Sequence, residues 1–470
     1  MEHSIYQKEI FKEINSGTDN LAIIARAGCA KTFSIIEGLK YVPKGKTVLC
    51  TAFNKAIADE LKKRAPTYVD CQTFHSTGFR AIKNKFGAVE VDEYKTRGIL
   101  EKILEVKYYE CIPELLRTIS LCKGSLKDSP DEVMNIVNKY SIDFYPMEEE
   151  YFVKKVIGTL GICKQNKSTI DYDDMTWYPF VYNMYIGKWD YIFVDEFQDL
   201  NNAQIYITKL ASKQNSRLFF FGDPRQRIFS FTGANAESIE DTFEKLSVKR
   251  LPLPMTYRCP KSIVKLANEI VPDFICPDDA IEGSIKFINY NQILENIRPG
   301  SYFLSRYNAP LIKYCMMFIK HNKPANIQGK DIGTNLISFI KKSRSKTIID
   351  LGKYLLKWKE KETKRLSDLN KPIDDVLDKF ECLNNLIEES ETLTQLKQLI
   401  NKMFVEINSD DVIICSTIHR IKGKQAKDVF ILRNTLNKGS SEEEDNIYYV
   451  GITRASENLF FIDKNIEVNV

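Results

Sequence analysis

The stretch "NLAIIARAGCAKT" (residues 20–32) runs from an apolar segment through a glycine-bearing loop to a Lys-Thr pair. A phosphate-binding loop between a strand and a helix is usually written G-x-x-x-x-G-K-[ST], and its backbone N–H groups close around an anion. Both glycine positions of that pattern, Ala25 and Ala30, are alanine here, while Gly28 remains. The loop alone leaves two alternatives open: a nucleotide site, or a chance Lys-Thr at the start of a helix.

Other apolar runs have the same form: each ends in small or acidic residues and leads into a helical pattern. They are "KTVLCTAFNK" (46–55), "WDYIFVDE" (189–196), "RLFFFGD" (217–223) and "DVFILRN" (428–434). Repeated strand, loop and helix predict an α/β fold of parallel sheets with helices on both faces.

Two stretches interrupt this α/β pattern, at about 85–180 and about 342–403, and both read as helical. We therefore predict two lobes, 1–250 and 251–470, each with a mainly helical insertion. The lysines of "IIDLGKYLLKWKEKETKRL" (348–366) leave two alternatives, a solvated helix face or a surface that tracks DNA.

Bulk composition narrows the class of protein. The 470 residues are 43% hydrophobic and carry a net charge of +4, which permits a nucleic-acid partner without requiring one. The eleven cysteines include no C-x-x-C pair, so we expect reduced thiols rather than a zinc or iron–sulfur site. The N-terminus does not resemble a signal peptide, and no apolar run approaches the ~18 residues of a membrane span. We expect a soluble intracellular protein.

An acidic pair follows the strand in "WDYIFVDEFQD" (189–199). A carboxylate at the tip of a buried parallel strand lies where such sheets bind ligands. Asp195 can hold Mg²⁺ while Glu196 orients or deprotonates an attacking water. The alternative is an ordinary acidic turn, but the Lys-Thr loop upstream favours the metal site.

A second strand ends in "LFFFGDPRQRIFSFTGA" (218–234), where Gln226 is followed by Phe229 and Phe231. The spacing of the two phenylalanines allows simple strand alternation into a core. The neighbouring glycine, proline and arginine favour a loop instead, on which phenyl rings offer stacking surfaces for nucleic-acid bases.

Taken together, the motifs resemble those of the UvrD/Rep/PcrA family of superfamily-one DNA helicases, in that family's order along nearly the whole chain. The resemblance rests on Gln7, "ARAGCAKT" (25–32), "TAFNKAIADEL" (51–61), "TFHS" (73–76), "VDEFQD" (194–199), "GDPRQRIFSFTGA" (222–234), "TYRCP" (256–260), "STIHRIKGK" (416–424) and "YVGITRA" (449–455).

The resemblance implies two RecA-like lobes that clamp ATP between them, and it assigns roles to single residues. Lys31 would reach the β- and γ-phosphates, Thr32 and Asp195 would hold Mg²⁺, Glu196 would activate water, and Gln226 would sense the γ-phosphate. Arg258 and Arg454 would act as arginine fingers from the second lobe. The implied nucleotide contacts are Gln7, Ala25, Arg26, Ala27, Gly28, Cys29, Ala30, Lys31, Thr32, Phe33, Tyr257 and Gln425. The implied DNA contacts are Phe53, Asn54, Phe74, His75, Phe229, Phe231 and His419.

Several positions depart from the family pattern. Ala30 replaces a glycine; because it adjoins the expected helix start, we predict a helical φ there and a positive φ at Gly28, so that the loop still works. Phe33 replaces an arginine and either stacks on adenine or joins the core. Gln425 replaces a glutamate that binds the nucleotide sugar, and Thr232 an arginine near the second motif aromatic.

We therefore predict an ATP-dependent enzyme that moves on single-stranded DNA, 3′-to-5′ by family resemblance, and couples hydrolysis to duplex unwinding. Its expected partners are single-stranded DNA and single/double-strand junctions, it would not bind membranes, and the free protein would be monomeric. We expect it in the cytoplasm or at a site of DNA replication. Two alternatives stay open: a translocase that strips proteins from DNA with little unwinding, and a degenerate ATPase that acts as a DNA-binding scaffold.

Overall fold

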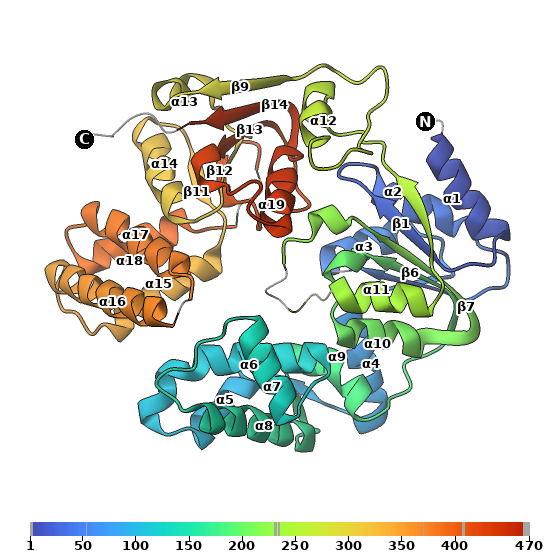
Figure 1. Cartoon of the computed structure of the whole chain (residues 1–470), viewed down its shortest axis with the longest axis horizontal. Coiled ribbons are helices and arrows are strands. Elements are labelled where there is room, and N and C mark those ends of the chain that lie inside the picture. The colour runs from blue at the N-terminus through green and yellow to red at the C-terminus, as the bar shows by residue number, and fades with distance from the viewer. Residues whose placement is uncertain are drawn as a thin grey trace. The chain divides into compact units, whose positions relative to one another are not determined.

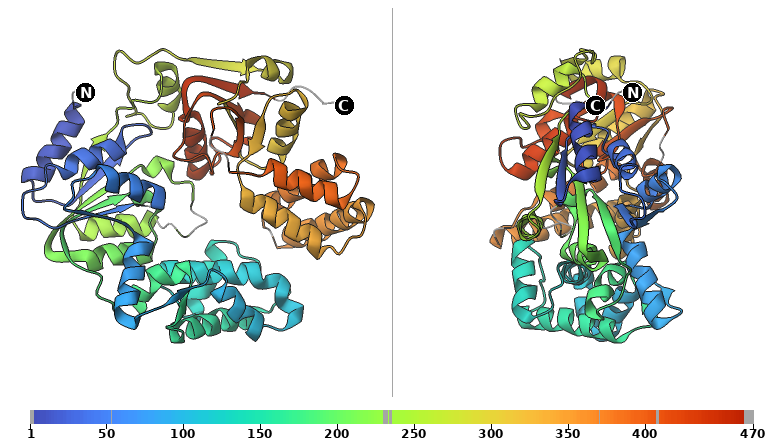
Figure 2. Two further views of the ribbon diagram at one scale, coloured as in Figure 1. Left: turned by 180° about the vertical axis from the view of Figure 1, so that it is seen from behind. Right: turned by 90° about the vertical axis from the view of Figure 1, so that its right-hand side faces the viewer.

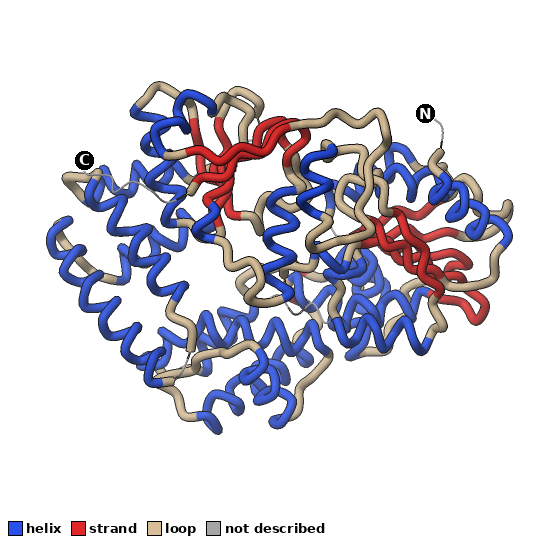
Figure 3. Tube along the Cα trace, turned by 45° about the horizontal axis from the view of Figure 1, so that its top comes forward, coloured by secondary structure: helices blue, strands red, loops and turns tan. Residues whose placement is uncertain are grey.

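The computed structural model describes residues 3–52, 54–229, 233, 236–369, 371–406 and 409–463. The chain forms two compact units, Met1–Pro254 and Met255–Val470 (Figure 1). Within the described residues, no helix combines the length and the apolar character needed to cross a membrane. The strands gather into two main sheets, each flanked by helices (Figure 3).

The first unit is built on a six-stranded parallel sheet with the strand order β3-β2-β6-β7-β1-β8. Register pairs Ile24 with Gly222 and Asp195 with Phe221, so the three central strands end together at one edge of the sheet. The strands are β1 (Leu21–Ala25), β2 (Val48–Ala52), β3 (Val69–Thr73), β6 (Trp189–Asp195), β7 (Ser212–Gly222) and β8 (Lys249–Leu253).

Successive residues of the central strands face two different cores, which is the expected alternation for a sheet covered on both faces. Ile23, Phe193 and Phe219 pack beneath α1 (Ile5–Ser16), α2 (Lys31–Leu39) and α3 (Lys55–Arg64). Ile192, Val194 and Phe220 face the other side, which carries α10 (Asn202–Ala211) and α11 (Ala236–Lys245). The predicted α/β fold with helices on both faces is confirmed.

The first insertion is a helical bundle beside this sheet (Figure 2). It comprises α5 (Lys95–Ile103), α6 (Ile112–Ser125), α7 (Pro130–Lys139), α8 (Glu149–Gln165) and α9 (Tyr172–Val181), with a small strand pair, β4 (Glu90–Val91) and β5 (Thr169–Ile170). Helix α9 packs tightly on α4 (Phe74–Phe86): a Cβ at Gly78 would lie 1.7 Å from the carbonyl oxygen of Met175. The sequence did not predict the strand pair.

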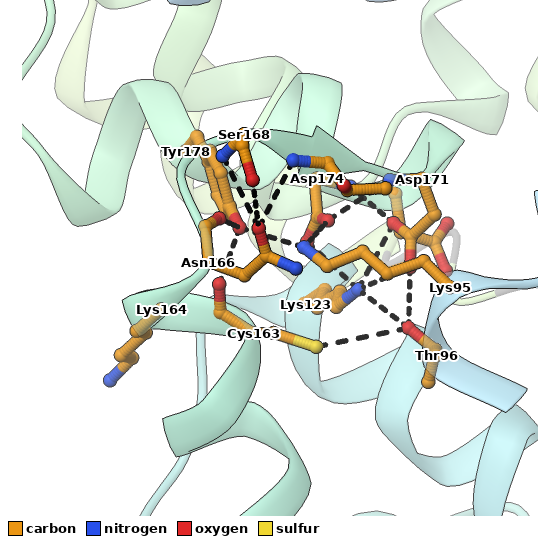
Figure 4. Close-up of polar contacts among 12 residues, drawn as sticks. Lys95, Thr96, Lys123, Cys163, Lys164, Asn166, Ser168, Asp171, Asp174 and Tyr178 are labelled. Atoms are coloured by element: carbon orange, nitrogen blue, oxygen red, sulfur yellow. Dashed lines mark hydrogen bonds and ion pairs between the residues drawn. The ribbon is translucent and has the colours of Figure 1, made fainter. Parts of the chain in front are cut away.

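A buried ion cluster holds this bundle together (Figure 4). Lys95 Nζ lies 2.6 Å from Asp174, and Lys123 Nζ lies 2.8 Å from Asp171 and 2.9 Å from the other oxygen of Asp174. Asp171 and Asp174 also accept each other's backbone N–H as the capping box of α9. The cluster thereby joins α5, α6 and α9.

The second unit repeats the architecture with a parallel sheet in the order β11-β12-β10-β13-β14-β9. Its strands are β9 (Ser284–Ile288), β10 (Tyr302–Ser305), β11 (Ala325–Ile327), β12 (Ile413–Thr417), β13 (Ala426–Leu432) and β14 (Ala455–Ile462). Its helices include α12 (Lys261–Ala267), α13 (Tyr290–Asn296), α14 (Ala309–Lys320) and α19 (Glu442–Ile452). Both units are RecA-like α/β lobes.

The second insertion consists of α15 (Lys330–Lys342), α16 (Ile348–Asp368), α17 (Asp374–Glu388) and α18 (Leu393–Met403). Leu351 and Leu355 of α16 are buried in the core of this unit. Lys353, Lys357 and Lys361 lie on its exposed face, one helical turn apart.

Candidate functional site

The loop between β1 and α2 contains two residues in the left-handed region. Gly28 has φ 71°, as predicted, whereas Ala30 has φ 60° and ψ 41°. The prediction of a helical φ at Ala30 is wrong because Ala30 is the residue that caps α2, and cap residues lie outside the helical region. Its carbonyl oxygen accepts from the backbone N–H of Ser34 at 2.9 Å and from the Ser34 hydroxyl at 3.1 Å, which secures this conformation. Alanine there costs roughly 1–2 kcal/mol.

Lys31, the first residue of α2, bridges the two carboxylates that follow β6. Its Nζ lies 2.7 Å from Asp195 Oδ1 and 2.5 Å from Glu196 Oε1. Burial alone would lower the pKa of Lys31, but the two carboxylates outweigh it and raise that pKa above its usual value. Burial, with Glu196 nearby, raises the pKa of Asp195, against the opposing effect of Lys31. One ammonium thus faces two carboxylates, leaving an excess negative charge.

Glu196 has a strained backbone and a fixed side chain. Its φ is 53°, a left-handed conformation that is uncommon outside glycine. Gln198 Nε2 donates to Glu196 Oε2 at 2.6 Å, while Gln198 Oε1 accepts from the backbone N–H of Asp223 at 3.0 Å. A Cβ at position 222 would lie 2.2 Å from Gln198 Oε1, so this contact requires Gly222. Gln198 was not among the predicted site residues.

Asp223 connects the loop between β1 and α2 with the segment that follows β7. Its carboxylate is 1% exposed and accepts from Arg26 Nη1 at 2.8 Å and from Gln226 Nε2 at 2.9 Å. The prediction missed Asp223 as a site residue, although its place after an apolar strand is the same signal that identified Asp195. The Asp223 carboxylate therefore fixes the positions of both the Arg26 guanidinium and the Gln226 amide.

Gln7 and Phe33 lie on neighbouring helices, α1 and α2. Gln7 Oε1 accepts from the backbone N–H of Ser4 at 3.0 Å, and Gln7 Nε2 donates to the Ser34 hydroxyl at 3.0 Å. Part of the amide therefore caps α1 and ties it to α2, and one N–H of the amide remains for another acceptor. The ring of Phe33 lies 6.0 Å from that of His3.

In the second unit, three predicted nucleotide residues lie together. Arg258 Nε donates to Gln425 Oε1 at 2.6 Å, and Arg258 Nη1 donates to the carbonyl oxygen of Thr453 at 3.3 Å. Tyr257, next to Arg258, is 44% exposed. Arg454 is only 1% exposed and donates to the carbonyl oxygens of Val450 and Lys424. It therefore braces the end of α19 from within this unit.

The predicted DNA contacts differ in exposure. Asn54 caps α3, its side chain accepting from the N–H of Ile57 at 2.9 Å, and Phe229 is half-buried. Phe74 is 1% exposed and belongs to the core, so its predicted DNA contact is corrected to a packing role. Phe53 and Phe231 lie outside the described residues, as does Thr232.

Both histidines of the predicted DNA site are half-buried. Burial lowers the pKa of His75, with Asp173 opposing. Burial, with Arg306 and Lys422 nearby, lowers the pKa of His419 to about 4. His419 is therefore a neutral imidazole at pH 7, able to donate and to accept a hydrogen bond.

The sequence matches two family descriptions. Residues 6–246 match the UvrD/REP helicase N-terminal domain, and residues 185–465 match the UvrD-like helicase C-terminal domain. Each match covers more than half of the 470 residues.

The individual relatives share about a quarter of their residues with this chain in the matched regions, and the share of each relative that is matched differs widely. The ATP-dependent DNA helicase Rep of Buchnera aphidicola subsp. Acyrthosiphon pisum is 24% identical, over 93% of this chain and 92% of Rep. Rep of Buchnera aphidicola subsp. Baizongia pistaciae is 26% identical, over 53% of this chain and 40% of that protein. The ATP-dependent DNA helicase PcrA of Bacillus subtilis is 27% identical, over 53% of this chain and 37% of PcrA. The matched part thus spans less than half of the latter two relatives.

Proposed function

The chain belongs to the UvrD/Rep helicase family, and on that premise we propose that it is a motor that hydrolyses ATP, moves 3′-to-5′ along single-stranded DNA and unwinds duplexes. The supporting observation is the cluster of Lys31, Asp195 and Glu196 at the edge of the first sheet, where parallel α/β sheets bind ligands.

The residues around Lys31 suit a magnesium nucleotide. Carboxylate and hydroxyl oxygens are ligands that Mg²⁺ accepts, and the excess negative charge beside Lys31 favours a cation. Thr32 and Asp195 would hold the ion, which supplies charge neutralisation to the phosphates. Lys31 would bind the β- and γ-phosphates, and Glu196, oriented by Gln198, would take a proton from the attacking water.

The remaining nucleotide roles follow the same assignment. Gln226 would sense the γ-phosphate while Asp223 keeps its amide in place. Arg258 and Arg454 would neutralise charge on the transferring phosphoryl group, and Tyr257 would stack on adenine. For Arg454 this role requires the buried guanidinium to leave the carbonyl oxygens that it now contacts.

Single-stranded DNA would contact Asn54, His75, Phe229 and His419, and the helical insertions would contact the duplex at a junction. Within the described chain, Lys353, Lys357 and Lys361 of α16 form no ion pair, so their charges are available to phosphates. We propose that the protein is intracellular and that it is monomeric in the free state.

A strand-displacement assay tests the proposal, run beside an ATPase assay with and without single-stranded DNA. Duplexes with a 3′ tail should be unwound, those with a 5′ tail should not, and DNA should stimulate hydrolysis. Turnover without unwinding would replace this function with that of a protein-stripping translocase. Unwinding of only the 5′-tailed substrate would overturn the direction.

A second candidate function is a DNA-bound scaffold with little turnover. The observation that favours it is Ala30, because an alanine at φ 60° strains the phosphate loop. In the same pair of assays, DNA binding without stimulated hydrolysis would support the scaffold and contradict the motor.

A further inference from the structure

Two cysteines face each other on neighbouring strands of the first sheet. Cys50 of β2 is the register partner of Cys71 of β3. Both contribute to the apolar cluster on one face of the sheet, so their side chains lie on the same side. Neighbouring strands are about 4.8 Å apart, which is within the range of Cα separations of about 4.4–6.8 Å found in disulfides.

The two thiols differ in access. Cys50 is fully buried, whereas Cys71 is half-buried on β3, the edge strand of the sheet. A hydrogen bond between the two thiols raises the pKa of Cys50 and lowers that of Cys71, and Lys62 also lowers the pKa of Cys71. Cys71 is therefore the more nucleophilic and the more accessible sulfur.

We propose that Cys50 and Cys71 are a reversible oxidation site for hydroperoxides, and that the disulfide between them slows the DNA-stimulated ATPase. The second half of this statement rests on the proposed function. Both cysteines are free thiols in the structure.

The chemistry needs only a hydroperoxide as co-reactant. With hydrogen peroxide, the Cys71 thiolate attacks one oxygen, breaks the O–O bond and becomes a sulfenic acid; the departing hydroxide takes a proton and leaves as water. Cys50 sulfur then attacks the Cys71 sulfur, the S–O bond breaks, and the Cys50 proton leaves with the oxygen as a second water. Two thiols are oxidised and one hydroperoxide is reduced, and a thiol reductant reverses the bond.

The position of the pair connects oxidation to activity. Strand β2 leads directly to Asn54 and β3 leads to His75, both predicted DNA contacts. Cys50 is also the register partner of Phe193, two residues before Asp195 on β6. A disulfide requires Cβ atoms about 3.8 Å apart, closer than the spacing of about 4.8 Å between neighbouring strands, so we expect the strand ends to shift when it forms. Shifts of about 1 Å at a functional site can cost up to about 100-fold in rate.

The second unit contains a matched control pair. Cys315 of α14 and Cys415 of β12 also have neighbouring thiols, and both are fully buried. Because both thiols are fully buried, we expect this pair to stay reduced under conditions that oxidise Cys50 and Cys71.

The test treats the full reduced chain with hydrogen peroxide, blocks the remaining thiols, and maps peptides by mass spectrometry beside an ATPase assay with single-stranded DNA. We expect a disulfide-linked product that contains Cys50 and Cys71 and is two hydrogens lighter than the two reduced peptides together. We also expect about a tenfold loss of DNA-stimulated ATPase activity. Dithiothreitol should reverse both changes. The Cys71→Ala variant should show neither, and the Cys315→Ala variant should behave like the unmodified protein.

Absence of the linked peptide, or its formation with an unchanged ATPase, would overturn the proposal. If the reduced protein shows no DNA-stimulated ATPase at all, the proposed function fails and the regulatory effect fails with it. The peptide map still decides the disulfide in that case, because mass detection does not depend on activity.

Discussion

Two clusters of lysines and acidic residues lie in the first unit, and they differ in charge, backbone conformation and exposure. In the insertion, Lys95 and Lys123 pair with Asp171 and Asp174 at 2.6–2.9 Å (Figure 4). At the edge of the sheet, Lys31 alone faces Asp195 and Glu196 at similar distances. The distances therefore do not distinguish the two clusters.

Charge balance, backbone conformation and access do distinguish them. The ion pairs of the insertion cluster join two lysines with two carboxylates, carried by regular helices and the capping box of α9. The cluster at Lys31 has an excess negative charge, and its loops contain two strained residues, Ala30 and Glu196. Lys31 and Glu196 are also partly exposed, whereas Lys95 and Asp174 are sealed. Balanced and sealed charges fit a structural role; unbalanced charges on a strained, open edge fit a binding site.

The largest expected effect is on activity, from Lys31→Ala. We expect ATP hydrolysis to fall by about 10³-fold or more, because the phosphates lose their ammonium partner. The free energy of unfolding should fall by at most about 1–2 kcal/mol, since a cation from solution can reach the open carboxylates.

Steady-state ATPase and urea unfolding measure the two quantities for Lys31→Ala. The control is Lys40→Ala, at the C-terminal end of α2, where an exposed lysine pairs with Glu37 and neither quantity should change. An active Lys31→Ala protein would contradict the assignment of the site.

The next effect is on stability, from Lys123→Met. Removing this ammonium leaves Asp171 and Asp174 short of a partner in a sealed core, which we expect to cost about 3–5 kcal/mol. Urea unfolding followed by circular dichroism measures it. Lys164→Met is the matched control, because that lysine forms an exposed pair with Asp128 and should cost less than about 1 kcal/mol. If Lys123→Met and Lys164→Met lowered the free energy of unfolding equally, the distinction between buried and exposed ion pairs would be refuted.

Acid should act in opposite directions on Asp171 of the insertion and on Asp195 at the edge of the sheet. Burial acts to raise the pKa of Asp171, but Lys123 and Thr96 outweigh it, so its pKa is lowered and its stabilisation is lost below about pH 4. Burial raises the pKa of Asp195, so acidification through that raised value increases stability, an increase complete below about pH 4.

Unfolding free energies measured from pH 6 to pH 3 test these signs. In the Asp171→Asn variant, the free energy of unfolding should no longer fall as the pH drops below about 4. In the Asp195→Asn variant, it should no longer rise as the pH drops toward 4. Each change should amount to about 1 kcal/mol per unit of pKa shift of the replaced carboxyl. Parallel profiles for the two variants would refute the contrast.

The smallest effect is expected from Ala30→Gly. Glycine relieves the cost of φ 60° but increases the freedom of the unfolded chain, so we expect a net gain of about 0.5–1 kcal/mol with ATPase retained. Thermal or urea unfolding checks the gain. Ala27→Gly, in the same loop but without a positive φ, should instead reduce stability. A loss of stability in Ala30→Gly would show that the loop conformation is not strained.

Much of the fold follows from residue pattern. Apolar runs such as those ending at Ala25 and Asp195 predict buried parallel strands, because strands covered on both faces need apolar residues throughout. The carboxyl ends of such strands lie at one edge, so the sequence could also place Lys31 and Asp195 in one site. Asp223 has the same signal, an acidic residue after an apolar strand, and it could have been predicted in the same way.

The insertion cluster could not be predicted. Lys95, Lys123 and Asp171 are far apart in the sequence, and nothing in the neighbouring residues distinguishes any of them from an ordinary exposed charge. Only the packing of α5, α6 and α9 removes them from water and requires that they pair. Phe74 is similar: its motif suggests a DNA contact, and the packing of the core buries its ring.

By itself, the sequence determined the two α/β lobes, their helical insertions and the order of the motifs. The reason is that buried strands and ligand-binding loops can be predicted from residues that are neighbours in the sequence. Tertiary structure alone decided the left-handed conformation of Ala30, the burial of Arg454 and the strand register that places Cys50 beside Cys71. The physical reason is that conformational strain, desolvation and register depend on neighbours brought together by folding, which local residue pattern does not specify.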